Sequence, residues 1–211
     1  MMRRPALVIG LALLAGGCSH SPPTQYYVLA PATPASTYAE PYAGEPIWIA
    51  AVNFPPEYDR PELVDNQGSS ELVLHDFAHW AAPVGELARK ALTEDLMARL
   101  PPGRVVSSTT STIPHRDIVV DILSLRREGD VTVLDVTWTL SPEQPALSRP
   151  GTSVTADLAA QTARLSEKSA SPGPRGQTEV LGRLLGRTAD SIALALARSN
   201  SSRSGSGSPS N

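Results

Sequence analysis

Residues 118–140 read IVVDILSLRREGDVTVLDVTWTL, and they predict two β-strands joined by a tight turn. The runs 118–126 and 131–140 are rich in β-branched residues, and Glu128-Gly129-Asp130 between them supplies residue types that favour a turn. The side chains of the second run alternate between two faces. One face is apolar and the other polar: Leu134, Val136, Trp138 and Leu140 against Asp135, Thr137 and Thr139. This stretch therefore predicts an antiparallel hairpin with one buried face.

Two further segments carry apolar residues at the spacing of an amphipathic helix. In residues 85–100 the apolar face consists of Leu87, Ala88, Ala91, Leu92, Leu96 and Leu100. The sequence Pro101-Pro102-Gly103 follows directly and predicts the end of this helix. In residues 177–198 one face consists of Leu181, Leu184, Leu185, Thr188, Ile192 and Leu196. Gly182 and Gly186 also lie in this segment, and we expect them to allow close packing on the sheet.

Shorter runs predict strands at residues 26–29, 47–52 and 71–76, the first of them at a sheet edge. Residues 53–65 contain three prolines and predict an ordered but irregular loop. For residues 154–168 the composition favours a helix, whereas the hairpin needs a third strand beside it, and we expect a strand over the second half. Together these elements predict an α+β fold, with two layers, in which two amphipathic helices pack on a mostly antiparallel sheet.

The N-terminus has the pattern of a secretory signal. Arg3 and Arg4 precede an apolar run that is shorter than the roughly 20 residues needed to span a bilayer. The run ends at Ala15-Gly16-Gly17-Cys18, which resembles the bacterial lipobox, in which the cysteine thiol receives a diacylglycerol and the chain is cut before it. Cys18 is therefore the predicted lipidation site, and several acyl chains such as palmitate would hold the mature chain on a membrane. The alternative is an incidental cysteine in a cleaved signal.

We expect four regions along the chain. Residues 1–17 form the lipoprotein signal peptide, and residues 18–46 the lipidated N-terminus, a Pro-rich tether and the first short strand. Residues 47–198 form the folded domain, and the Ser/Gly-rich residues 199–211 a disordered tail. Ser19 follows the cysteine where an aspartate would favour inner-membrane retention in enteric bacteria. By resemblance to that sorting rule, we expect the outer membrane, with the domain facing the periplasm.

Charge and composition exclude several classes of function. The whole chain has 18 Lys and Arg against 21 Asp and Glu, and removing Arg3 and Arg4 with the signal leaves 16 basic residues and a net charge of −5. This acidic balance argues against nucleic acid as a partner and against a basic surface for anionic lipid. The single cysteine excludes a disulfide within the monomer.

Catalytic patterns are sparse. The sequence has neither a Gly-x-Ser-x-Gly motif nor a glycine-rich phosphate loop. His75 and His79 are four residues apart, a spacing that suits a metal only on a helix, and we expect loop histidines instead of a metal site. Glu57, Asp59 and Glu62 surround Arg60, and salt-bridged loop charges explain them better than acid–base catalysis. We expect no enzyme activity, no metal and no cofactor.

One block of sequence resembles a known family. It comprises FPPEYDRPELV at 54–64, HWAAPV at 79–84 and the helix that follows, together with the Tyr27-Val28-Leu29 strand near the cysteine. These features resemble the ABC-type transport auxiliary lipoprotein component family, which includes the paraquat-inducible protein C type. The family's usual Trp-Ala-Glu-Pro-Leu reads WAAPV here, so the acidic residue is missing.

The resemblance implies a non-enzymatic accessory subunit. Its partners would be a substrate-binding protein of the mammalian-cell-entry (MCE) type, an ABC permease and an ATPase that together move lipids or other hydrophobic compounds across the envelope. The Pro-rich loop with Tyr58, Asp59, Arg60 and Pro61 is a candidate docking surface, on which we expect Tyr58 to be exposed, and a packed structural loop is the alternative. Two other functions are a structural or assembly lipoprotein of another outer-membrane complex and a hydrolase dependent on His79. Homo-oligomerisation is left open.

Overall fold

The computed structural model describes residues 22–34, 42–68, 70–107, 113–141 and 160–205. Two helices and two β-sheets form an α+β fold, which confirms the predicted class. The larger sheet has the order β5-β2-β6-β7-β8, and its strands are β2 (Ile47–Asn53), β5 (Val105–Val106), β6 (Arg116–Glu128), β7 (Val131–Leu140) and β8 (Gln161–Lys168). The smaller sheet has the order β1-β4-β3, and its strands are β1 (Gln25–Tyr27), β3 (Glu62–Asn66) and β4 (Leu72–Trp80).

The predicted hairpin forms the middle of the larger sheet. β6 and β7 pair antiparallel from Ile118 opposite Leu140 to Glu128 opposite Val131, and Gly129 takes a positive φ of 67° in the turn. β8 pairs antiparallel with β7, which confirms the strand expected in the second half of 154–168. The apolar face of β7 is buried as predicted: Leu134, Val136, Trp138 and Leu140.

Most of the strand pairing is antiparallel, as predicted, but each sheet also contains parallel neighbours and is therefore mixed. β2 runs parallel to both β5 and β6, and β1 runs parallel to β4. Parallel neighbours need a long crossover connection, and here β3, β4 and helix α2 (Val84–Met97) lie between β2 and β5 along the chain. These parallel neighbours were not predicted, because the single-strand patterns of β1, β2 and β5 do not encode the direction of their neighbours.

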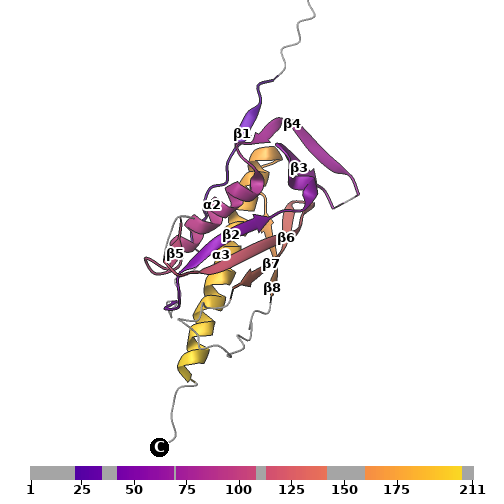
Figure 1. Ribbon diagram of the computed structural model, residues 1–211. Helices are drawn as coiled ribbons and strands as arrows, with labels where there is room; N and C mark the ends of the chain where they lie inside the picture. The colour runs from indigo at the N-terminus through magenta and orange to yellow at the C-terminus, as the bar shows by residue number, and fades with distance from the viewer. Residues whose placement is uncertain (1–21, 35–41, 69, 108–112, 142–159, 206–211) are drawn as a thin grey trace, which may run out of the picture.

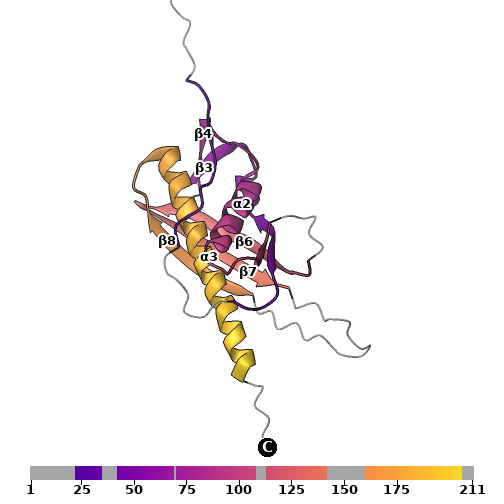
Figure 2. The ribbon, with the colours of Figure 1, turned by 90° about the vertical axis from the view of Figure 1, so that its left-hand side faces the viewer.

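Both predicted helices are present and lie side by side on one face of the larger sheet (Figure 1 and Figure 2). α2 ends near the predicted Pro-Pro-Gly sequence, and helix α3 runs from Gly173 to Gly205. The predicted apolar face of α3 is buried, including Thr188, which donates to the carbonyl of Leu184. α3 continues beyond residue 198, so the expected disordered tail is wrong for residues 199–205, because each added helical residue gains a backbone hydrogen bond.

The segment between β2 and α2 is more regular than its prolines predicted. Residues 53–65 contain a 3₁₀ helix, η1 (Pro56–Tyr58), and most of β3. β4 extends beyond the expected residues 71–76 to Trp80, which is buried in the core. The short strand expected at 26–29 is β1, at an edge of the smaller sheet as predicted. The smaller sheet lies beside the end of the larger sheet from which the N-terminal chain leaves (Figure 1).

Candidate functional site

The predicted signal peptide and Cys18 lie outside the described residues, which begin at residue 22. After β1 the chain passes over the helices as a segment that we call the strap (residues 28–32). Leu29 in the strap is buried in the core. The predicted first strand, β1, pairs with β4. Ala30 and Ala32, which we expected to belong to the tether, contact α3 and α2 and are thus part of the folded body.

Two glycines of α3 let the strap approach the helix backbone. A Cβ atom at Gly182 would lie 3.0 Å from the carbonyl oxygen of Ala30, and one at Gly186 would lie 2.4 Å from the Cβ of Ala32. These glycines therefore accommodate the strap, and our expectation that they pack on the sheet is wrong. The sequence could not show this, because the strap lies more than 150 residues earlier in the chain.

A buried ionic cluster, which we call the latch (Asp95, Arg99 and Asp190), holds the end of the strap. The backbone N–H of Ala32 donates to Asp95 Oδ1 at 2.7 Å, and Arg99 Nη1 donates to the Ala32 carbonyl at 3.4 Å. Arg99 also binds Asp95 Oδ1 at 3.2 Å and Asp190 Oδ1 at 2.7 Å. The side chains of Asp95 and Arg99 are fully buried. The latch thus joins α2, α3 and the strap in one polar contact.

The latch was not predicted from the sequence, although the residues around Asp95 carry a signal for it. Asp95 lies in α2 beside Leu92 and Leu96, and Arg99 follows it by four residues in the turn after α2, within the segment where the helical spacing predicts apolar residues. Charged residues are almost never fully buried unless they are paired. Two opposite charges inside an apolar helical stripe therefore predict a buried ion pair.

Burial raises the pKa of Asp95 to about 6, against the opposing effects of the Ala32 hydrogen bond and the Arg99 charge. The cause is visible in the geometry. Asp95 Oδ1 accepts hydrogen bonds, whereas Oδ2 is buried with no hydrogen-bond partner among the described residues. The folded protein therefore holds this proton more tightly than an unfolded chain, whose reference value is 3.8.

This difference predicts a pH dependence of stability. Because the folded-state pKa is the higher one, the contribution of Asp95 is fully present below pH 4 and is lost as the pH rises through about 6. We expect the free energy of unfolding of wild type, relative to Asp95→Asn, to fall by up to about 3 kcal/mol between pH 4 and pH 7. Urea unfolding at several pH values measures this free-energy difference. If the free energies of unfolding of the two proteins changed with pH in parallel, the prediction would be contradicted.

A second prediction concerns the close contact at Gly186. Gly186→Ala should lower the free energy of unfolding by about 1–2 kcal/mol, because the new methyl group meets Ala32, despite the better helix propensity of alanine. The double variant Gly186→Ala/Ala32→Gly removes the opposing Cβ and should recover most of the loss. Thermal unfolding of the three proteins gives the comparison. An equal loss in the single and double variants would show that the strap does not pack here.

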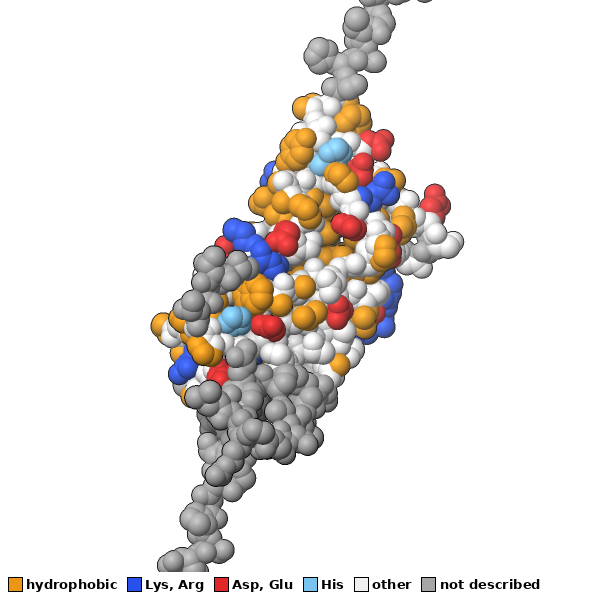
Figure 3. All heavy atoms as spheres, in the orientation of Figure 1, with side chains coloured by type: hydrophobic (Ala, Val, Ile, Leu, Met, Phe, Trp, Pro, Cys, Tyr) orange, Lys and Arg blue, Asp and Glu red, His pale blue; other side chains and the backbone are white. Residues whose placement is uncertain are grey.

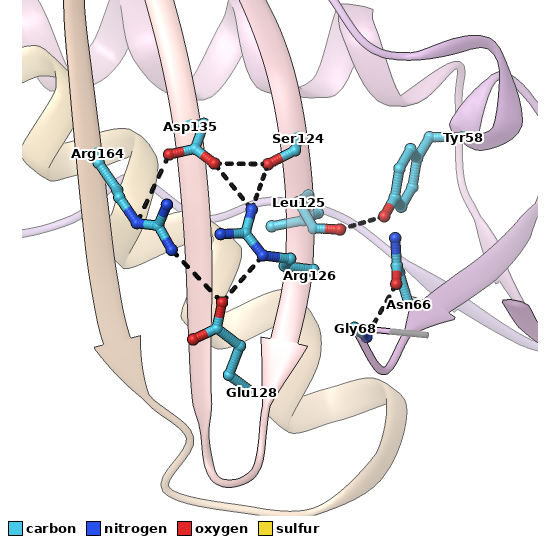
Figure 4. A network of polar contacts seen from close by, with 9 residues as sticks. All are labelled: Tyr58, Asn66, Gly68, Ser124, Leu125, Arg126, Glu128, Asp135 and Arg164. Carbon is cyan, nitrogen blue, oxygen red and sulfur yellow. Dashed lines mark hydrogen bonds and ion pairs between the residues drawn. The ribbon is translucent and has the colours of Figure 1, made fainter. Parts of the chain in front are cut away.

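Tyr58, a candidate docking residue, is buried in the structure, which corrects our expectation of an exposed ring. Its hydroxyl group donates a hydrogen bond to the Leu125 carbonyl of β6 (Figure 4). Its ring lies beside the ring of Phe54. Burial raises the pKa of Tyr58 to about 12, so the hydroxyl stays protonated and remains a donor. Tyr58 therefore fastens η1 to the larger sheet. The other three candidates, Asp59, Arg60 and Pro61, are exposed.

One of the predicted loop ion pairs, between Arg60 and Glu62, is present. Arg60 Nε binds Glu62 at 3.0 Å, and this bond lowers the pKa of Glu62. His79 lies in β4, where its Nε2 is 3.1 Å from the Asp76 carbonyl oxygen and its ring meets Tyr26 edge to face. His75 and His79 are thus strand residues instead of loop residues. In the described part of the chain, no group of three or more His, Cys, Asp or Glu is placed to hold a metal ion.

A cleft of about 530 Å³ lies between the two sheets. Its walls come from η1, β3, the β6–β7 turn and the segment before α3. The charged side chains in its wall are paired with other protein groups. Arg127 binds Asp65 at 2.6 Å, and Asp130 binds Lys168 at 2.6 Å. These pairs engage the charged groups of Arg127 and Asp130 in contacts within the protein.

Arg126 completes the wall and belongs to an ionic network on the outer face of the larger sheet (Figure 4). It binds Asp135 at 2.8 Å and Glu128 at 2.9 Å, and Arg164 of β8 approaches the same two carboxylates. The Arg126 and Ser124 hydrogen bonds lower the pKa of Asp135. The network spans β6, β7 and β8, so it orders the sheet and offers no acid–base pair for catalysis.

The sequence model of the ABC-type transport auxiliary lipoprotein component family matches residues 27–193. This chain belongs to that family. The match includes the strap, the latch, both sheets and most of α3. The family is an auxiliary component of ABC-type transport and a lipoprotein, which is not a class of enzyme. No curated protein matches the chain.

Two solved structures share the fold of this family member. An uncharacterised protein has 18% sequence identity and a TM-score of 0.62, with 83% of this chain and 99% of the other covered. A Xanthomonas campestris protein assigned to the DUF330 family has 13% identity and a TM-score of 0.61, with 85% and 99% covered. In the described residues of this chain, no helix is long and apolar enough to cross a membrane.

Proposed function

We propose that this auxiliary lipoprotein is anchored through Cys18 to the outer membrane, faces the periplasm, and serves an ABC system that moves lipids or other hydrophobic compounds. Its partners in this proposal are an MCE-type substrate-binding protein, the permease and the ATPase. The observation that carries it is the family match over 27–193, which begins nine residues after the lipobox-like cysteine. The anchor would raise the effective concentration of the domain beside its partners.

The exposed part of the η1–β3 loop is the proposed docking surface. Asp59, Arg60 and Pro61 are exposed. Tyr58, directly before them, is buried and holds the start of the loop on β6 through its hydrogen bond to the Leu125 carbonyl. The Pro61 carbonyl also accepts a hydrogen bond from the Trp80 backbone N–H at 2.7 Å, which holds the loop against β4. A loop fixed at both ends loses little entropy on binding and therefore suits a docking role.

Affinity purification from native membranes in mild detergent, followed by mass spectrometry, tests the proposal. We expect wild type to retain an MCE-type protein with its permease and ATPase, and Arg60→Glu to retain less. Arg89→Glu is the matched control, because Arg89 forms a comparable ion pair with Glu86 on α2. Recovery of a different outer-membrane complex, with no transporter subunit, would contradict the proposal and support the structural or assembly alternative.

A further inference from the structure

The end of the smaller sheet at which β1 pairs with β4 carries a group of exposed apolar side chains, which we call the β1–β4 patch (Tyr26, Val28 and Phe77). Tyr26 is 69% exposed, Val28 64% and Phe77 45%. Tyr26 of β1 lies directly opposite His79 of β4 in the strand register, so their side chains share one face of the sheet. Phe77 precedes His79 by two residues along β4 and therefore points to the same face. Single exposed apolar residues are common on proteins, but a group of them at one end is not.

Figure 3 shows hydrophobic side chains gathered around a histidine at the end of the molecule from which the N-terminal chain leaves. The opposite end of the described chain is the C-terminal part of α3 (Figure 1). The strap and the latch fix this geometry, because they hold the residues after β1 against both helices. The N-terminal chain can therefore emerge from the folded domain at another position only if these contacts break.

Chain length then limits how far the patch can lie from Cys18. Gln25 follows Cys18 by seven residues, which span at most roughly 25 Å when fully extended. A relaxed segment of this length spans about 15 Å. The polar interfacial layer of a bilayer is itself about 5–8 Å thick on each side. A lipidated Cys18 would therefore keep the β1–β4 patch close to the headgroups.

We propose that the β1–β4 patch rests on the lipid bilayer, with Tyr26, Val28 and Phe77 inserted among the headgroups and first methylenes; this inference rests on the proposed Cys18 anchor. Aromatic side chains with an apolar body suit this interface. The mature net charge of −5 provides no general attraction to anionic lipid, so the contact is apolar and insensitive to salt. Glu62 of β3 lies opposite His79 of β4 in the strand register, so the docking loop, which precedes Glu62, borders the same end of the molecule.

Fluorescent labels on the lipidated full-length protein test this inference. The thiol of Cys18 is consumed by the lipid, so a cysteine introduced at Tyr26 or Phe77 is the only free thiol. Tyr26→Cys, Phe77→Cys and the control Leu123→Cys, whose native residue is 54% exposed on β6, are labelled with bimane. Each protein is then reconstituted in phosphatidylcholine vesicles with or without nitroxide-labelled phosphatidylcholine.

We expect the nitroxide lipid to quench roughly half of the fluorescence at positions 26 and 77, and to leave position 123 almost unchanged. Equal, weak quenching at all three positions in protein that floats with the vesicles would overturn the inference and leave the anchor intact. Labels shielded from aqueous iodide but not quenched by lipid would also overturn it, because a protein contact would then cover the patch. Protein that does not float would instead overturn the proposed anchor, and the inference with it.

Discussion

Replacement of Arg99 by methionine is expected to lower the free energy of unfolding by about 3–5 kcal/mol at pH 7, because Asp95 then remains buried without its cation. The loss should be smaller at pH 5, where Asp95 can take up a proton. Chemical denaturation at both pH values measures the two losses. Arg89→Met is the control on the same helix, and its exposed pair with Glu86 should contribute less than about 0.5 kcal/mol.

The same variant should release the strap from the helices. The Ala32 backbone N–H donates to Asp95, so its hydrogen exchange reports directly on the latch. We expect faster exchange at Ala32 in Arg99→Met under conditions where the sheet core remains protected. Unchanged exchange at Ala32 and a loss no larger than that of Arg89→Met would show that the latch does not hold the N-terminal segment.

Truncation of the Tyr58 side chain is also expected to lower the free energy of unfolding by a large amount. Tyr58→Ala should destabilise the fold by about 3–5 kcal/mol, because it removes a buried ring and its hydrogen bond to Leu125. Tyr58→Phe keeps the ring and should cost only about 1–2 kcal/mol for the unpaired Leu125 carbonyl. Thermal unfolding separates the two. A docking role for Tyr58 would instead leave stability unchanged and reduce partner binding in both variants.

Periodic sequence patterns predicted the elements whose structure is local. The hairpin around Gly129 and the buried faces of both helices follow from spacing alone, because one residue pattern specifies each of them. Strands β3 and β5 were not predicted, because they are short and are stabilised by partners distant in the chain. The parallel direction of β2 likewise depends on its connection to α2 and not on its own residues.

The residues of the candidate site divide in the same way. Asp59, Arg60 and Pro61 are exposed, as turn-forming polar and proline residues usually are. Tyr58 is buried because its partner, Leu125, lies on a strand 67 residues later, a contact that no local pattern encodes. The strap could not be predicted either, because Pro-rich composition suggests an extended chain and does not show which surface that chain contacts.

The central claim is that Cys18 anchors a domain whose first strand and strap are built into the fold. Mass spectrometry of the mature N-terminus, with protein purified from membranes of the native host, tests it most directly. We expect the mature chain to begin at Cys18 and to carry a thioether-linked diacylglyceryl group, and the Cys18→Ala variant to stay uncleaved. A wild-type chain that begins at another residue, or an unmodified Cys18 thiol, would contradict the anchor and the function built on it.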